Sequence, residues 1–223
     1  MVFANRDDAG RRLAARLGYL RGERVVVLGL PRGGVPVAFQ VARALDGPLD
    51  VIVVRKLGVP WQPELAMGAV GEGGVRVINR RVVREAGVSE EELAAIAARE
   101  QAAVGARAAL YRARWPRRPL DGRVAVVVDD GIATGATARA ACQVARAHRA
   151  ARVVLAVPVA PPGWHEGIGG EADDLVCVRT PSLFFATGQF YASFPQVSDD
   201  EVLACLRRSA AGHHGAAAGS GPP

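Results

Sequence analysis

Two adjacent carboxylates followed by a loop of small residues are the part of the sequence best suited to chemistry. In the stretch VVVDDGIATGAT, Asp129 and Asp130 directly follow an apolar run that is typical of a buried strand. The loop after them exposes backbone N–H groups ahead of a helix, which favours a bound phosphate. Because carboxylates repel phosphate but accept hydrogen bonds from vicinal hydroxyls, the pattern favours ribose at the acids, a 5′-phosphate in the loop and Mg²⁺ nearby. The alternative is an ordinary strand-end turn with solvated aspartates.

Three further segments carry groups that could act on the same ligand. The turn PRGGVP, residues 31–36, follows the apolar run Val25–Leu30 and contains Arg32. Arg55 and Lys56 end the next strand, and residues 57–74 form a Gly- and Pro-rich excursion that contains Glu64. A plain glycine turn, a solvated basic strand end and an exposed loop glutamate are the respective alternatives.

Short apolar strands alternate with helices along the chain. Strands are expected at 25–30, 50–56, 123–130, 152–159 and 175–178, and helices at 8–20, 37–45, 90–114, 137–149 and 199–208. Ser89 and Glu92 have the spacing of a capping box at the start of the third helix. The alternation predicts an α/β fold with a mainly parallel sheet, in which ligands bind beyond the carboxyl ends of the strands. Both PRGGVP and DDGIATGAT fall at such ends.

The composition fits one α/β domain. The 223 residues are 50% hydrophobic, yet no apolar run approaches the roughly 20 residues of a membrane span. The N-terminus lacks the apolar core of a signal peptide, so a cytoplasmic protein is predicted. The three cysteines and four histidines show no metal-ligand or disulfide spacing, which argues against a transition-metal site.

The net charge of +6 permits a nucleic-acid partner but does not favour one. The basic residues are dispersed, and no basic block is interleaved with aromatic residues. Anionic small molecules are equally compatible partners. Lys56 is the only lysine in the chain, which slightly favours a functional role for it.

The stretch VVVDDGIATGAT resembles the motif with which type I phosphoribosyltransferases bind phosphoribosyl pyrophosphate (PRPP). The turn PRGGVP is similar to the pyrophosphate loop of that family, and the resemblance covers Phe3 to about Arg208. It implies a mainly parallel five-stranded sheet flanked by helices, a flexible loop and a small "hood" over the strand ends. Residues 1–208 would form this single domain, with the flexible loop at about 57–74, the hood at about 181–195 and a mobile tail at 209–223.

The resemblance implies a role for each candidate residue. The two acids would hold the ribose 2′- and 3′-hydroxyls with Mg²⁺ nearby, and the loop would hold the 5′-phosphate. Arg32 and the amide of Gly33 would meet the pyrophosphate, in many members through an unusual cis peptide, and Glu64 could accept or relay a proton from the attacking nitrogen. The PRPP-binding set is Asp129, Asp130, Gly131, Ile132, Ala133, Thr134, Gly135, Ala136, Thr137, Gly33 and Arg55, and the catalytic set is Arg32, Lys56 and Glu64.

The acceptor is less well defined by the sequence. Family members stack the acceptor base in the hood, which makes Phe184, Phe185 and Tyr191 the candidates here, although these rings could instead form the hood's own core. Enzymes of the family that act on 6-oxopurines usually carry an acid where this sequence has Ala133, which argues against hypoxanthine or guanine.

The function implied by the resemblance is transfer of a phosphoribosyl group from PRPP to a nitrogen acceptor, a nucleobase in a salvage-type reaction, with release of pyrophosphate. The alternative is a non-catalytic regulator of RNA or DNA that senses PRPP or a nucleotide on the same fold. No nucleic-acid-binding extension is found in the sequence. Whether the protein is a monomer or a homodimer is left open.

Overall fold

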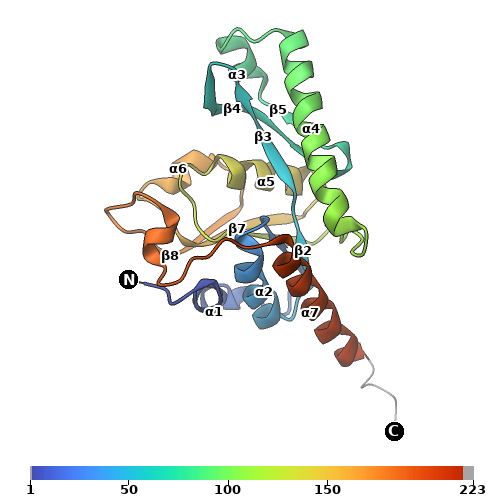
Figure 1. Cartoon of the computed structure of the whole chain (residues 1–223), viewed down its shortest axis with the longest axis vertical. Helices are drawn as coiled ribbons and strands as arrows, with labels where there is room; N and C mark the ends of the chain where they lie inside the picture. The colour runs from blue at the N-terminus through green and yellow to red at the C-terminus, as the bar shows by residue number, and fades with distance from the viewer. Residues whose placement is uncertain (1, 218–223) are drawn as a thin grey trace.

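A parallel five-stranded sheet forms the centre of the computed structural model, which describes residues 2–217 (Figure 1). The strands are β1 (Val25–Gly29), β2 (Leu49–Val51), β6 (Val124–Val128), β7 (Arg152–Val159) and β8 (Asp174–Arg179). They lie in the order β2-β1-β6-β7-β8, and every neighbouring pair is parallel. All residues of β1 and β6 are buried, as their continuous apolar sequences predict. The predicted α/β fold is therefore confirmed.

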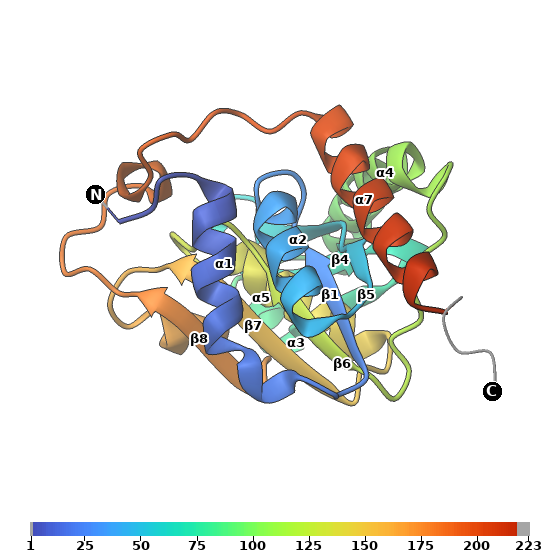
Figure 2. The same cartoon turned by 90° about the horizontal axis from the view of Figure 1, so that it is seen from below.

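Helices cover both faces of this sheet. One face packs against α1 (Arg6–Arg16), α2 (Gly34–Leu45) and α7 (Asp199–Ala217), which Figure 2 shows side by side. The other face packs against α5 (Ala136–Ala147) and α6 (Trp164–Ile168). Alternate residues of β6 face the two layers: Val126 belongs to the first core and Val127 to the second.

A separate lobe replaces the extended excursion expected after the second strand. The predicted strand 50–56 divides into β2, in the parallel sheet, and β3 (Val54–Val59), which pairs with β4 (Gln62–Gly71) and β5 (Arg76–Ile78) in an antiparallel sheet. The chain continues through the turn Glu72–Gly74 and through α3 (Arg80–Glu85) and α4 (Glu90–Arg112). The lobe lies above the parallel sheet in Figure 1.

Local signals explain where α4 begins. The Ser89 side chain accepts a hydrogen bond from the Glu92 N–H at 3.1 Å, and the Glu92 carboxylate accepts one from the Ser89 N–H at 2.9 Å. The capping box predicted from the sequence is thus confirmed. The helix ends at Arg112, two residues before its predicted end.

The last helix is longer than predicted. It was expected to end at Arg208, but α7 continues to Ala217, and the buried Ser209 hydroxyl accepts a hydrogen bond from the Leu49 N–H at 3.4 Å. The beginning of the predicted tail is therefore helical and packs against β2, while residues 218–223 lie outside the described residues. Within residues 2–217, no helix combines the length and apolar character needed to cross a membrane.

A buried cluster of charges joins the lobe to the parallel sheet. Arg112 at the end of α4 donates to Asp50 of β2 at 2.7 Å and to Glu72 at 2.6 and 3.0 Å. Asp50 is 2% exposed, and burial raises the pKa of its carboxyl although the Arg112 charge opposes that shift. The cluster is therefore stable only while its cation is present.

Replacing Arg112 by methionine is expected to lower the free energy of unfolding by about 3–5 kcal/mol, because it leaves two buried carboxylates without a cation. The urea unfolding midpoint measures this loss. The triple variant Asp50→Asn, Glu72→Gln, Arg112→Met should recover much of it, and Arg114→Met on the exposed surface should change little. Equal midpoints for the Arg112 and Arg114 variants would contradict this account.

Candidate functional site

The acid pair lies at the carboxyl edge of the parallel sheet, directly after β6. Oδ1 of Asp129 accepts a hydrogen bond from the Asp130 N–H at 2.9 Å. Burial raises the pKa of the Asp129 carboxyl well above its usual range, and the adjacent Asp130 charge adds to this. Burial also raises the pKa of Asp130, against the effect of a nearby arginine. The pair therefore holds negative charge that the protein does not fully neutralise.

The PRGG turn packs directly against these acids, as the shared sheet edge predicted. A Cβ at Gly33 would overlap Oδ2 of Asp130, and one at Gly34 would lie 2.6 Å from the Val128 carbonyl oxygen and 2.8 Å from Cα of Asp129. Gly34 therefore requires glycine for the close approach of two backbones, whereas a side chain at Gly33 would displace the Asp130 carboxylate. The Pro31–Arg32 peptide is cis, as members of the resembled family led us to expect.

Arg32 is half-buried beside this turn. Among residues 2–217 its guanidinium has no hydrogen-bond or ion-pair partner. A partly desolvated cation without a partner is suited to an anionic ligand.

The loop from Gly131 to Gly135 leads into α5. Ile132 is buried, and its N–H donates to the Val159 carbonyl at 2.9 Å, which ties the loop to β7. Gly135 has φ of +78° and provides no side chain to cap the first turn of α5. The first N–H groups of the helix are therefore left for another acceptor, with the exposed Thr134 and Thr137 hydroxyls beside them.

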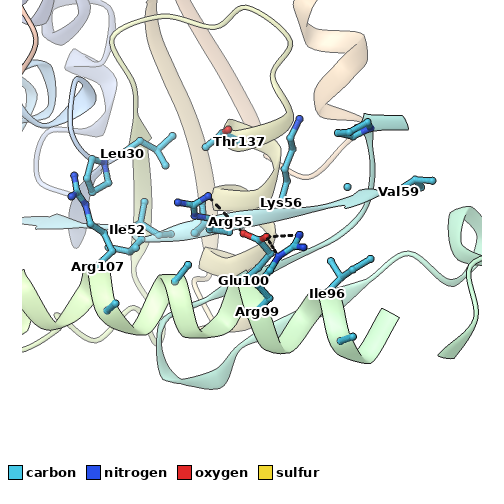
Figure 3. Close-up of a pocket in the computed structure, with 18 of the residues that line it drawn as sticks. Leu30, Ile52, Arg55, Lys56, Val59, Ile96, Arg99, Glu100, Arg107 and Thr137 are labelled. Atoms are coloured by element: carbon cyan, nitrogen blue, oxygen red, sulfur yellow. Dashed lines mark hydrogen bonds and ion pairs between the residues drawn. The ribbon is translucent and has the colours of Figure 1, made fainter. Parts of the chain in front are cut away.

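A cleft of about 1430 Å³ opens between β3 and α4 (Figure 3). Arg32, Arg55, Lys56 and Thr137 all line it, so the structure brings together residues from three predicted segments. Arg55 lies 3.7 Å from the Glu100 carboxylate of α4. Lys56 pairs with Glu64 at 2.9 Å across the β3–β4 hairpin. Glu64 itself is 69% exposed and does not line the cleft.

The segment predicted to be the hood, residues 181–195, pairs with the N-terminal segment. The Phe3 N–H donates to the Phe190 carbonyl at 2.9 Å, and the Ala192 N–H donates to the Phe3 carbonyl at 2.8 Å. Tyr191 is buried, and its hydroxyl donates to the Asp130 carbonyl at 2.6 Å. A Cβ at Gly131 would overlap the Thr187 side chain, so the hood also touches the small-residue loop.

The three predicted acceptor residues have different surroundings. Tyr191 lies in the hood core beside the acids, and Phe184 stacks on Phe190 with 5.2 Å between ring centroids. Phe185 is 84% exposed. The rings thus form much of the hood's own core, the alternative weighed from the sequence, and only Phe185 presents most of its surface outward.

Arg6 is a site residue that sequence reasoning missed. Its Nε and Nη2 both lie 2.9 Å from Oδ2 of Asp130, and its Nη1 donates to the Pro195 carbonyl at 2.7 Å. The guanidinium also stacks over the Phe194 ring, 3.7 Å from its centroid. No local motif marks this arginine, because it reaches Asp130 across 124 residues of sequence.

Comparison with known proteins identifies the family. A family model described as a phosphoribosyl transferase domain matches residues 4–166. The chain belongs to this family. Two proteins of Mycobacterium tuberculosis, from strains CDC 1551 and H37Rv, are each 59% identical to the chain over 208 residues and are provisionally named phosphoribosyl transferases. Those matches cover 93% of this chain but 47% of each relative, so the chain spans about half their length.

A solved structure shares the whole fold of this phosphoribosyl transferase domain. The crystal structure of the protein TT1426 from Thermus thermophilus is 45% identical, superposes with a TM-score of 0.88, and is matched over 93% of this chain and 99% of that one. The lobe and the hood are therefore set within a fold that a second protein adopts over nearly its full length.

The acid pair of this phosphoribosyl transferase domain is expected to reduce stability. Since burial raises the pKa of Asp129, its carboxyl binds a proton more tightly in the folded than in the unfolded state. Stability should therefore fall as the pH rises from about 4, the ordinary pKa of aspartate, through the raised value. Asp129→Asn should then melt at a higher temperature than the unaltered protein at pH 7–8, by roughly 2–4 °C per kcal/mol gained.

Melting curves between pH 4 and pH 8 measure this effect. The gain should shrink toward pH 4, where the folded protein already carries the proton on Asp129. Asp121→Asn, at an exposed carboxylate, is the matched control. An Asp129→Asn variant that melts no higher than the unaltered protein at pH 8 would contradict the burial argument.

Proposed function

We propose that this domain transfers a phosphoribosyl group from PRPP to a nitrogen acceptor and releases pyrophosphate. The observation that carries the proposal is the arrangement of free oxygen atoms at the acid pair. Oδ1 of Asp129 is used by the backbone and Oδ2 of Asp130 by Arg6. Among residues 2–217, Oδ2 of Asp129 and Oδ1 of Asp130 have no hydrogen-bond or ion-pair partner on another residue, so each acid keeps one oxygen available to a ligand. Two neighbouring acceptors match the two vicinal hydroxyls of a ribose.

The 5′-phosphate and the pyrophosphate of PRPP would also meet complementary groups near the acids. The uncapped start of α5 would receive the 5′-phosphate, and Arg32 with Lys56 would receive the pyrophosphate. Arg55 would support them after releasing Glu100. Held in this way, the bond from C1′ to the pyrophosphate oxygen can break while the ribose stays fixed.

Charge stabilisation is the main task of the protein in this reaction. As the bond breaks, negative charge builds on the leaving pyrophosphate, and the arginine and lysine of the cleft stabilise it. Mg²⁺ would lie near the acid pair without direct contact, because the two free carboxylate oxygens are assigned to the ribose, and no group of three or more His, Cys, Asp or Glu side chains in residues 2–217 forms a complete site. When bound, Mg²⁺ would add further stabilisation of the pyrophosphate charge. Glu64, beside Lys56, would take or relay the proton of the attacking nitrogen after the hairpin moves toward the cleft.

A pyrophosphate-release assay with PRPP, Mg²⁺ and a panel of purine and pyrimidine bases tests this proposal. Turnover with one of these bases is expected, and hypoxanthine and guanine are the least favoured because of Ala133. PRPP binding without release for any base would favour the sensing alternative, in which RNA affinity should fall steeply with salt. A cytoplasmic location and the absence of a nucleic-acid partner stay predictions, and the choice between a monomer and a homodimer stays open.

A further inference from the structure

Asp130 is held by the hood and the N-terminal segment rather than by its own strand. Arg6, the first residue of α1, contacts Oδ2 with two nitrogen atoms, and the Tyr191 hydroxyl contacts the Asp130 carbonyl. The Arg6 side chain is 10% exposed and that of Asp130 is 16% exposed. The contact is therefore largely shielded from water. A charged hydrogen bond is stronger in such a shielded position than on the exposed surface.

The Arg6 guanidinium is itself fixed on three sides. Phe194 covers its face, the Pro195 carbonyl takes Nη1, and Asp130 takes Nε and Nη2. Because both nitrogen atoms meet the same carboxylate oxygen, the other oxygen of Asp130 is left in a defined direction. An arginine with this many contacts loses little further freedom when a ligand binds.

We propose that Arg6 is a positioning residue for ribose binding: it orients the free oxygen of Asp130 toward one ribose hydroxyl and links that orientation to the hood. This inference rests on the proposed function, since it assigns Asp130 to the ribose. Arg6 does not touch the sugar in this arrangement. It acts through Asp130, and Phe194 and Pro195 transmit the position of the hood to the acid.

The packing around Asp130 explains why an orienting group is needed. Oδ2 lies so close to the PRGG turn that a Cβ at Gly33 would overlap it, and the negative Asp129 lies directly before it in the chain. Without the cation, repulsion between the two carboxylates would turn Asp130 away from its present direction. A lysine in place of Arg6 would restore the charge but not the paired contacts or the stacking on Phe194.

Calorimetric titration with simple ligands isolates this role. Ribose 5-phosphate, its 2-deoxy and 3-deoxy analogues, and pyrophosphate are titrated in Mg²⁺ buffer into the unaltered protein, Arg6→Met and Arg6→Lys. Arg11→Met is the matched control, because Arg11 lies on the same helix, is 62% exposed and lies 3.9 Å from Asp8, one helical turn away. Melting temperatures show that each variant is folded.

Arg6→Met is expected to bind ribose 5-phosphate about tenfold or more weakly, and Arg6→Lys should recover part of that loss. The analogue that lacks the hydroxyl facing Asp130 should bind the unaltered protein and Arg6→Met alike, because the oriented oxygen no longer has a partner. Pyrophosphate binding should not change. If Arg6 had only a structural role, Arg6→Met would bind all of these ligands more weakly, pyrophosphate included.

Equal affinity of Arg6→Met and the unaltered protein for ribose 5-phosphate would overturn the inference while leaving the proposed function intact. If Arg6→Met weakens the binding of both deoxy analogues equally, the inference is overturned as well. If the unaltered protein binds neither ribose 5-phosphate nor PRPP, the proposed function fails and the inference fails with it. Should Arg6→Met not fold, the affinities of Arg6→Lys are compared with those of Arg11→Met, and the same outcomes support or overturn the inference.

Discussion

Replacing Asp129 and Asp130 together by asparagine is expected to weaken PRPP binding by at least about 100-fold, since two charge-assisted hydrogen bonds to the ribose are lost. Asparagine keeps the size of each side chain but removes the negative charge and presents a donor where an acceptor is needed. Calorimetric titration with PRPP and Mg²⁺ measures the change.

The double variant should nevertheless fold. Loss of two partly buried carboxylates removes an unfavourable charge pair, although Arg6 loses its carboxylate partner. Asp121→Asn, on the exposed surface, should bind PRPP as the unaltered protein does. Unchanged PRPP affinity in a folded double variant would remove the assignment of ribose to this acid pair.

Gly33→Ala is expected to weaken PRPP binding, whereas Gly34→Ala is expected to lower the stability of the fold. At Gly33 the added methyl group meets the end of the Asp130 side chain, which can rotate away, so the protein should fold but bind PRPP roughly tenfold to a hundredfold more weakly. At Gly34 the methyl group meets backbone atoms of Val128 and Asp129, which cannot move without disturbing β6. This second variant should lose about 1–3 kcal/mol or more of stability.

Thermal melting and PRPP titration on the same samples separate the two effects. Gly18→Ala is the control, because a Cβ there has open space around it. If Gly33→Ala retains full PRPP affinity, Asp130 has not been displaced or does not hold the ligand. If Gly34→Ala is as stable as Gly18→Ala, the two backbones are not in the close contact described.

The sheet and the location of the acids could be predicted because their signals are local. Continuous apolar runs such as Val126–Val128 indicate strands buried on both faces, and the residues that follow them must meet at one edge. A helix cap such as Ser89 depends on neighbouring residues alone. The PRGG turn and the acid pair were placed together on this basis, and the structure has them in contact.

The contribution of Arg6 and the antiparallel lobe depend on contacts between distant segments. Nothing near Arg6 distinguishes it from the other arginines of α1, and its partner is fixed only when the N-terminal segment pairs with the hood. Residues 57–74 are rich in Gly and Pro, which commonly indicates a loop, but pairing across β3, β4 and β5 outweighs that local preference. The sequence predicted Phe184, Phe185 and Tyr191 as one group of hood rings. It could not predict which of them are buried, because that depends on how the hood packs.

The charged cluster around Arg112 has a topological consequence. Asp50 lies just before the chain enters the lobe and Arg112 just where it leaves, so entry and exit are fastened at one point. The two ends of the insert therefore meet, as the ends of a closed loop do. The conformational entropy cost of closing such a loop rises only slowly with the number of residues in it. The lobe is thus an insertion between β2 and β6 whose two ends are joined by a buried ion pair, so its length should have little effect on the conformational entropy cost of forming the parallel sheet.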